Sequence, residues 1–279
     1  MISVIQLGTI DYATGLRLQQ RLVDLRKEGR VGDVLLLLEH SPVITLGRNA
    51  KRANLIASPE EVAEQGVEVF ECNRGGDVTF HGPGQLVGYP IFDLRGMASD
   101  DGSRKTVGAV EYVRRLEEVL IRTCADFGIP AKRIPGLTGV WTITEHVGPD
   151  VPVRVVEWSS TLAPTLEPAK IAAIGVHISR AVTSHGFALN VNIDLDYFNL
   201  IVPCGITSKP VTSMAKELGK EVSLQDVAHS VSRNFGAVFQ SHMLWLEDLG
   251  SLLRNSVGVP MKPPSELRKI HKEEDTSWA

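Results

Sequence analysis

Short apolar runs recur along the chain between polar or glycine residues. Their length is typical of buried strands rather than of helices. The strands that they predict occupy residues 2–8, 33–40, 42–47, 67–73, 138–143, 170–178 and 186–192.

A second pattern, with apolar side chains three or four positions apart, predicts helices at residues 11–29, 58–66, 107–128 and 223–240. Three of these segments open on Asp11, Ser58 and Ser223, residue types that commonly cap helices. In the helix expected at 107–128, the predicted buried stripe consists of Val110, Val113, Leu116, Leu120, Cys124 and Phe127.

The order of these elements indicates how the chain is organised. Strands and helices do not alternate strictly, so we expect an α/β (α+β) fold with a mixed β-sheet and flanking helices. Residues 145–168 contain four prolines and no helical period, which is typical of an insertion. We therefore expect a single domain over residues 1–250, followed by a charged, proline-rich tail over 251–279.

Composition excludes several classes of function. A formal net charge of −4 argues against a nucleic-acid binder, which usually carries a basic excess. The longest aliphatic run, at residues 34–38, is too short to span a membrane, and the first fifteen residues lack the pattern of a signal peptide. Three cysteines form neither a disulfide framework nor a metal-binding spacing, so we expect a cytoplasmic protein without a metal site.

Residues 73–90, NRGGDVTFHGPGQLVGYP, contain five glycines and two prolines, which is typical either of a linker or of a loop that approaches a ligand closely. A phosphate loop is disfavoured because the stretch lacks the Gly-Lys-Ser/Thr signature and because Pro83 removes an amide donor. A simple turn between strands would not explain Arg74, Thr79 and His81.

The three cysteines lie in different surroundings. Cys72 and Cys124 fall within apolar elements and are interpreted as buried, inert hydrophobic residues. Cys204 lies between proline and glycine, where it either fills a turn or acts as a nucleophile beside the backbone N–H groups of Cys204 and Gly205. A nucleophilic thiol needs a partner that favours the thiolate. The candidate partners are His81, His177, His185 and Lys170.

Four motifs taken together closely resemble the lipoate-protein ligase B family of octanoyltransferases: RGGDVTFHGPGQLVGYP, KIAAIGVHISR, TSHGFALNVN and IVPCGI. The resemblance extends in layout from residue 1 to about residue 245 and implies the fold of biotin and lipoate protein ligases. It implies transfer of octanoyl from octanoyl-acyl carrier protein to a lysine of lipoyl domains, those of 2-oxoacid dehydrogenase E2 subunits and of the glycine cleavage H protein. It further implies a monomer that needs no cofactor.

The resemblance also assigns roles to individual residues. The acyl-thioester cysteine of the family falls on Cys204, and the lysine that lowers its pKa falls on Lys170. In this interpretation glycines allow close approach of the backbone, while Val78 and Phe80 form an apolar wall for the acyl chain. The substrate-binding residues implied are Arg74, Gly75, Gly76, Asp77, Val78, Thr79, Phe80, His81, Ala173, Ile174, Gly175, Gly186, Phe187 and Ala188.

Some points stay open at this stage. The segments 97–106 and 145–168 are longer than the family usually has. The loop at 47–52, with Arg48, Lys51 and Arg52, is either a docking site for an acidic carrier protein or a solvated charge run. The competing functions are an ATP-dependent lipoate or biotin ligase, a non-catalytic acyl- or carrier-binding module, and an amidotransferase that moves octanoyl between lipoyl proteins.

Overall fold

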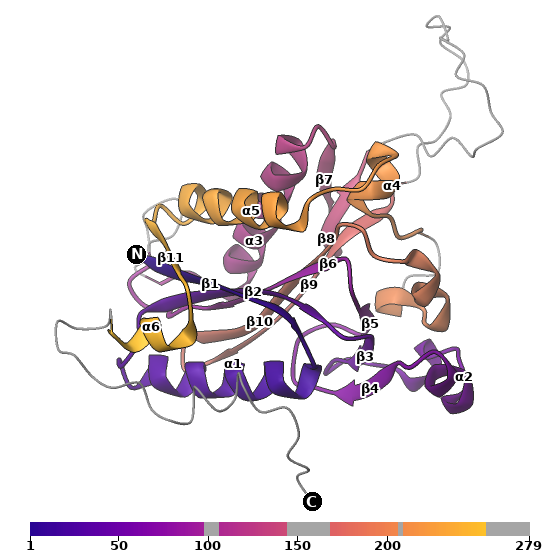
Figure 1. Ribbon diagram of the computed structural model, residues 1–279, viewed down its shortest axis with the longest axis horizontal. Helices are drawn as coiled ribbons and strands as arrows, with labels where there is room; N and C mark the ends of the chain where they lie inside the picture. The colour runs from indigo at the N-terminus through magenta and orange to yellow at the C-terminus, as the bar shows by residue number, and fades with distance from the viewer. Residues whose placement is uncertain (98–105, 144–167, 206–208, 255–279) are drawn as a thin grey trace, which may run out of the picture.

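A computed structural model describes residues 1–97, 106–143, 168–205 and 209–254, with the backbone alone for Cys204, Leu253 and Arg254. Most of the extension at 97–106, most of the insertion at 145–168 and most of the tail lie outside these residues, and so do the predictions for them. Within them the chain forms two β-sheets (Figure 1). The large sheet has eight strands in the order β11 (Met243–Leu246), β1 (Ile2–Ile10), β2 (Asp33–His40), β6 (Gln85–Ile91), β10 (Val182–Asn190), β9 (Lys170–Ser179), β8 (Leu137–Thr142) and β7 (Ala131–Ile134).

The strands pair in both senses. β1 lies parallel to β2 and β11, whereas β6, β10, β9, β8 and β7 join the sheet through antiparallel pairs. The small sheet contains β4 (Glu68–Glu71), β3 (Val43–Leu46) and β5 (Val78–His81), with β3 parallel to β4 and antiparallel to β5. The predicted mixed sheet is therefore confirmed.

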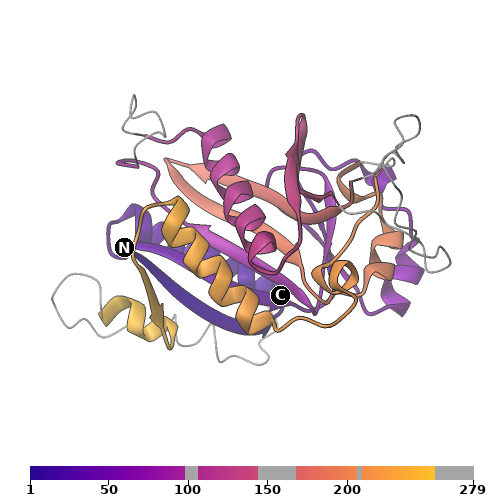
Figure 2. The same ribbon diagram turned by 90° about the horizontal axis from the view of Figure 1, so that it is seen from above.

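Helices cover both faces of the large sheet, as expected (Figures 1 and 2). On one face α1 (Tyr12–Lys27) buries Leu18, Leu22 and Leu25 against β2 and β6. On the other face α3 (Ala109–Asp126) and α5 (Leu224–Val238) pack against each other and the sheet. The remaining helical segments are short: η1 (Arg52–Asn54), α2 (Pro59–Glu64), η2 (Leu195–Leu200), η3 (Pro203–Gly205), α4 (Met214–Leu218) and α6 (Leu249–Arg254).

The predicted helix caps are confirmed. The side chains of Asp11, Ser58 and Ser223 each accept a hydrogen bond from a backbone N–H three residues further on. The predicted stripe of α3 is correct in part: Leu116, Leu120 and Cys124 are buried, Val113 and Phe127 are half-buried, and Val110 is 70% exposed. Cys124 is fully buried, and this burial raises the pKa of its thiol to about 12, as suits an inert hydrophobic residue.

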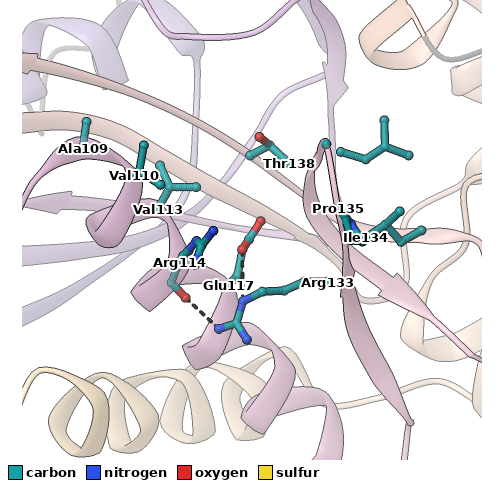
Figure 3. Close-up of a pocket in the computed structure, with 11 residues that line it drawn as sticks. Ala109, Val110, Val113, Arg114, Glu117, Arg133, Ile134, Pro135 and Thr138 are labelled. Atoms are coloured by element: carbon teal, nitrogen blue, oxygen red, sulfur yellow. Dashed lines mark hydrogen bonds and ion pairs between the residues drawn. The ribbon is translucent and has the colours of Figure 1, made fainter. Parts of the chain in front are cut away.

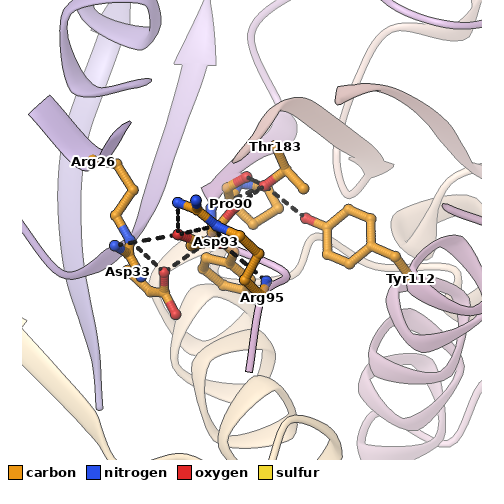
Figure 4. A network of polar contacts seen from close by, with 8 residues as sticks. Arg26, Asp33, Pro90, Asp93, Arg95, Tyr112 and Thr183 are labelled. Carbon is orange, nitrogen blue, oxygen red and sulfur yellow. Dashed lines mark hydrogen bonds and ion pairs between the residues drawn. The ribbon is translucent and has the colours of Figure 1, made fainter. Parts of the chain in front are cut away.

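Charged side chains fasten α1 to the ends of two strands (Figure 4). Arg26 pairs with Asp33 at the start of β2, at 2.8 Å, and Asp33 also accepts a hydrogen bond from the backbone N–H of Asp93. Asp93 forms a second ion pair with Arg95, at 2.6 Å. Hydrogen bonds from Arg95 hold the pKa of the Asp93 carboxyl below its ordinary value. The network fixes the end of the sheet where β2 begins and β6 ends.

The glycine-rich stretch contains two strands that the sequence did not predict, β5 and β6. Strand β6 lies in the middle of the large sheet although it includes a glycine and a proline. A Cβ atom at Gly88 would lie 2.1 Å from the ring of Phe187, so a glycine is needed where this ring crosses the strand. The stretch is therefore a structural junction between the two sheets and not a linker.

Candidate active site

A narrow pocket lies where the loop before β5 meets the large sheet. Its walls come from the first turn of α1, from residues 74–81, and from β6, β9 and β10. Its open volume is about 40 Å³, which is room for roughly three water molecules. Ten of the predicted substrate-binding residues line it: Arg74, Gly76, Thr79, His81, Ala173, Ile174, Gly175, Gly186, Phe187 and Ala188.

Close backbone contact closes one side of this pocket. The N–H of Gly75 donates to the carbonyl of Val176 at 3.0 Å, and a Cβ atom on Gly175 would lie 2.6 Å from the carbonyl oxygen of Gly75. Gly75 therefore holds the loop against β9 instead of lining the pocket. Glycines allow the two backbones to approach each other at this contact. The predicted close approach of the backbone to a ligand stays a prediction.

The expectation that Val78 and Phe80 form the pocket wall is wrong. Successive side chains of a strand point to opposite faces, so Thr79 and His81 face the pocket while their neighbours face away. Val78 and Phe80 belong to a separate core, in which the Phe80 ring stacks on Tyr197 at 4.7 Å.

Asp77 also lies outside the pocket wall. Its carboxylate accepts hydrogen bonds from the backbone N–H of Lys51, from its neighbour Val78 and from the side-chain amide of Asn54. These contacts tie the loop before β5 to the loop at 47–52. Asp77 therefore shapes the pocket indirectly.

Arg74 is buried beneath the loop, and its guanidinium is held by oxygen atoms of uncharged groups. Its Nη2 donates to the carbonyls of Asp77, at 2.6 Å, and of Thr45, at 2.7 Å. Its Nε and Nη2 donate to the Thr45 hydroxyl, and Nη1 donates to the carbonyl of Gly75. Among the described residues no carboxylate pairs with this guanidinium.

The sequence did not identify Tyr12, Val87, Tyr89 or His185 as wall residues; His185 was considered only as a partner for a thiol. The alternation of Gln85, Val87 and Tyr89 along β6 is a signal that could have found two of them. Tyr12 comes from α1, far away in the sequence. His185 adopts a left-handed backbone with φ of 54°, which is uncommon for a residue other than glycine.

Three histidines around the pocket are buried and neutral. Burial lowers the pKa of His40 to about 4 and the pKa values of His81 and His185 to about 3. Nε2 of His40 lies 2.6 Å from the Tyr89 hydroxyl, and the His81 ring stacks on Tyr12. His177, the fourth candidate partner for a thiol, is half-buried and does not line the pocket.

Cys204 lies in the short helix η3, which packs against β5. A Cβ atom on Gly205 would lie 2.8 Å from the Asp77 carboxylate, so this turn adjoins the loop before β5. The Gly205 N–H donates to the carbonyl of Val202 and does not provide the free donor expected beside Cys204. The structure does not describe the Cys204 side chain.

Lys170 begins β9, the strand that also provides Ala173, Ile174 and Gly175 to the pocket. A lysine at the start of an apolar strand usually extends its ammonium group into solvent, whereas the side chain of Lys170 is buried. Its Nζ lies 5.0 Å from the centre of the Trp141 ring, a distance at which an aromatic face attracts an ammonium group. Its backbone pairs with residues 210–212, which follow the Cys204 turn.

A larger groove of about 630 Å³ runs between α3 and the β7–β8 hairpin (Figure 3). Its walls are mainly apolar, and Glu117 and Arg133 form an ion pair within it at 3.1 Å. None of the predicted site residues lines this groove.

The described residues include neither a candidate metal-binding group nor a helix that could span a membrane. No three of their His, Cys, Asp or Glu side chains are grouped so that they could hold a metal ion. None of the helices in these ranges has the length and apolar character required to cross a membrane.

Comparison with known proteins identifies the family and the fold of this chain. Residues 11–236 match the family described as the lipoyl protein ligase A/B catalytic domain. The chain is 57% identical to an octanoyltransferase of Koribacter versatilis, over 98% of both chains. It is 54% identical to an octanoyltransferase of Acidobacterium capsulatum, over 91% of this chain and 96% of that one.

Solved structures show the same fold at low sequence identity. A lipoate-protein ligase A bound with ATP superposes with a TM-score of 0.62 at 15% identity, covering 91% of this chain and 93% of the other. A bipartite lipoate protein ligase from Thermoplasma acidophilum gives 0.58 at 17% identity, covering 91% of each chain. The predicted resemblance is thus confirmed: the chain belongs to the lipoate-protein ligase B family of octanoyltransferases and is an acyltransferase of protein lipoylation.

Proposed function

We propose that the chain transfers octanoyl from octanoyl-acyl carrier protein to a lysine of lipoyl domains through an acyl-thioester on Cys204. One observation carries the proposal: both proposed catalytic residues lie on elements that build or adjoin the pocket. Lys170 begins the strand that provides Ala173 to Gly175, and the Cys204 turn packs against the strand that provides Thr79 and His81.

In the first half-reaction the Cys204 thiolate attacks the carbonyl carbon of the octanoyl thioester. A new carbon–sulfur bond forms to Cys204, and the bond to the carrier thiol breaks. Lys170, as an ammonium group against the Trp141 ring, stabilises the thiolate before attack and gives its proton to the departing carrier thiolate. One thioester replaces another, so this step needs no ATP.

In the second half-reaction the neutral amine of the acceptor lysine attacks the Cys204 thioester. An amide forms, and the Cys204 thiolate leaves. Lys170, now neutral, accepts the proton that the amine releases and returns to its ammonium form. Each turnover therefore restores the starting charges of both residues.

The narrow pocket supports a linear acyl substrate. Its walls combine small residues, such as Ala173 and Gly186, with the rings of Tyr89 and Phe187. Since an eight-carbon chain is larger than roughly three water molecules, these side chains must move apart when the chain enters. A longer acyl chain requires a larger movement of these side chains, so the pocket is expected to discriminate between donors by the length of their acyl chain.

The carrier protein is proposed to dock at the loop 47–52. Arg48, Lys51 and Arg52 are exposed there, and the backbone N–H of Arg48 donates to the carbonyl of Arg74 at 3.0 Å. The exposed Arg52 pairs with Glu71 at 3.1 Å, a surface ion pair that an acidic partner can displace at little cost. A basic rim therefore adjoins the loop that closes the pocket.

Intact-mass measurement tests the covalent step. With octanoyl-acyl carrier protein, no acceptor and no ATP, the protein should gain one octanoyl group, and peptide mapping should locate it on Cys204. Cys204→Ala should abolish the adduct, whereas Cys72→Ala and Cys124→Ala should retain it. Lys170→Arg should retain more of the acylation than of the transfer to a lipoyl domain, because an arginine still stabilises the thiolates by its charge but does not accept the proton that the acceptor amine releases.

Three results would contradict the proposal or favour a rival. Cys204→Ala protein that still transfers octanoyl at near wild-type rate would exclude the thioester intermediate. A strict requirement for ATP would favour a ligase. A preference for octanoylated lipoyl protein over octanoyl-carrier as donor would favour an amidotransferase.

A further inference from the structure

Two buried amide side chains lie behind the pocket wall and do not line it. Gln85 and Asn190 are 2% and 4% exposed and lie opposite each other on β6 and β10. Nε2 of Gln85 lies 2.9 Å from Oδ1 of Asn190. At this burial, their hydrogen bonds must be made with other protein groups.

Backbone carbonyls fix the orientation of both amides. Nδ2 of Asn190 donates to the carbonyl of Thr212 at 2.9 Å, and Nε2 of Gln85 donates to the carbonyl of Phe80 at 3.2 Å. Because a carbonyl only accepts, the nitrogen ends of both amides are defined, and Oε1 of Gln85 must face His81. Nδ1 of His81 lies 2.7 Å from this oxygen and therefore carries the hydrogen. The neutral ring then has its lone pair on Nε2.

The same sense of donation continues on the other side of His81. The Thr45 hydroxyl accepts from Nε and Nη2 of Arg74, so its own hydrogen is free for Nε2 of His81, 3.5 Å away. A series of hydrogen bonds thus leads from Arg74 through Thr45, His81, Gln85 and Asn190 to the Thr212 carbonyl. Each group in the series accepts from the group before it and donates to the next. Hydrogen bonds aligned in this way polarise and strengthen one another.

This series of hydrogen bonds joins the pocket to the backbone of Lys170. The N–H of Lys170 donates to the carbonyl of Pro210 at 2.8 Å, and the N–H of Thr212 donates to the carbonyl of Lys170 at 2.9 Å. Asn190 therefore holds the segment that brackets the first residue of β9. His81, at the other end of the amide pair, lines the pocket itself.

We propose that Gln85 and Asn190 are positioning residues for octanoyl transfer, fixing His81 as the Nδ1–H tautomer in the pocket wall and holding residues 210–212 against Lys170. The proposal rests on the assignment of octanoyl transfer to this pocket. Its physical reason is that a hydrocarbon chain accepts no hydrogen bond. An N–H group directed at the chain would lose its partner, whereas here the His81 N–H is satisfied behind the wall.

Histidine NMR tests the tautomer without any variant. In protein labelled with ¹⁵N-histidine, long-range couplings at pH 7 should show His81 with its hydrogen on Nδ1. Replacement by methionine in Gln85→Met removes the acceptor and should produce a mixture that includes the Nε2–H form.

Steady-state kinetics tests the positioning role. Gln85→Met and Asn190→Leu should lower kcat about tenfold to a hundredfold with KM changed less than about threefold, the cost expected for small misplacement of reacting groups. Asn192→Leu is the matched control, since both ends of the Asn192 side-chain amide bond the backbone of Val222 and neither end bonds Gln85, Asn190 or His81. Its kcat should stay within about twofold of wild type.

A charged variant adds a pH signature. Gln85→Glu should place a carboxylate at Nδ1 and raise the pKa of His81, so that activity falls with decreasing pH as the ring becomes charged. In wild type the His81 ring stays neutral, because burial and the nearby His40, Arg74 and His185 keep its pKa at about 3. The decline should therefore appear in the ratio of variant to wild-type activity, measured above pH 6.5 where the fold is stable. Tyr12, which stacks on the ring, is a further titratable group that faces it.

Three outcomes would overturn the proposal. They are an Nε2–H tautomer or an imidazolium in the wild-type protein at pH 7, unchanged kcat in both Gln85→Met and Asn190→Leu, or an equal loss in Asn192→Leu. The first outcome is measured on wild-type protein, so it tests the proposal even if the variants fail to fold. Wild-type protein that shows the Nδ1–H tautomer but takes up no octanoyl would instead contradict the proposed function.

Discussion

Lowering the pH should destabilise this protein well before its carboxylates are protonated, because three histidines are buried as neutral rings. The folded pKa values of His40, His81 and His185 are about 4, 3 and 3, against an ordinary value of 6.5. Below pH 6.5 each histidine binds a proton in the unfolded chain but not in the folded one. The free energy of unfolding is therefore largest above pH 6.5 and falls as the pH decreases toward the folded pKa values.

The size of the effect follows from this linkage. One histidine changes the free energy of unfolding by about 1.4 kcal/mol per pH unit within the window, and three change it by about 4 kcal/mol per unit. Over roughly two pH units the loss is about 8 kcal/mol, which is comparable to the whole stability of a typical domain. The carboxyls with lowered pKa values, such as Asp93, bind protons in the unfolded chain only near pH 4. Above pH 5 the change in the free energy of unfolding therefore comes from the histidines.

Urea unfolding at several pH values between 7.5 and 5, followed by circular dichroism, measures this slope. Each midpoint is converted with its own m-value. Replacing the exposed His242 by glutamine is the control and should leave the slope unchanged. A slope near zero between pH 6.5 and 5 would refute the conclusion that the three rings are buried in their neutral form.

Two further predictions concern the pocket. Gly175→Ala should lower octanoyl transfer at least tenfold and destabilise the fold by about 1–3 kcal/mol, because its Cβ would lie 2.6 Å from the Gly75 carbonyl. Gly32→Ala is the control, because its Cβ meets no atom within 4 Å, and it should have little effect in the same assays. Donors shorter than octanoyl should lose about fourfold in kcat/KM per methylene, and a flat profile from six to sixteen carbons would contradict a narrow acyl pocket.

The long elements could be predicted from the sequence because local signals agreed with the tertiary structure. The predicted helix at 11–29 and α1 differ by one or two residues at each end, and the Asp11 cap is present. The predicted strand at 33–40 coincides with β2. In both segments the apolar spacing, the length and the flanking residues all indicate the same element.

The strands of the glycine-rich stretch could not be predicted in this way. Glycine and proline normally indicate turns, yet β6 retains Gly88 in the middle of a sheet because the Phe187 ring occupies the space of its side chain. This reason lies on β10, about a hundred residues away. Val110 shows the opposite case, because its spacing fits the buried stripe of α3 although its side chain is largely exposed among the described residues.

Residue types alone do not define whether the pocket accepts a polar or an apolar group. Arg74, His81 and Tyr89 would suggest a polar pocket, whereas the site we assign to the acyl chain must accept a hydrocarbon. The structure reconciles the two because polar hydrogens are directed behind the wall: the guanidinium to a threonine and backbone carbonyls, the imidazole to Gln85. Nδ1 of His40 donates to a backbone carbonyl, so its Nε2 accepts the Tyr89 hydroxyl hydrogen. An acyl chain can then enter without breaking these bonds, and its binding follows from the apolar area that it buries.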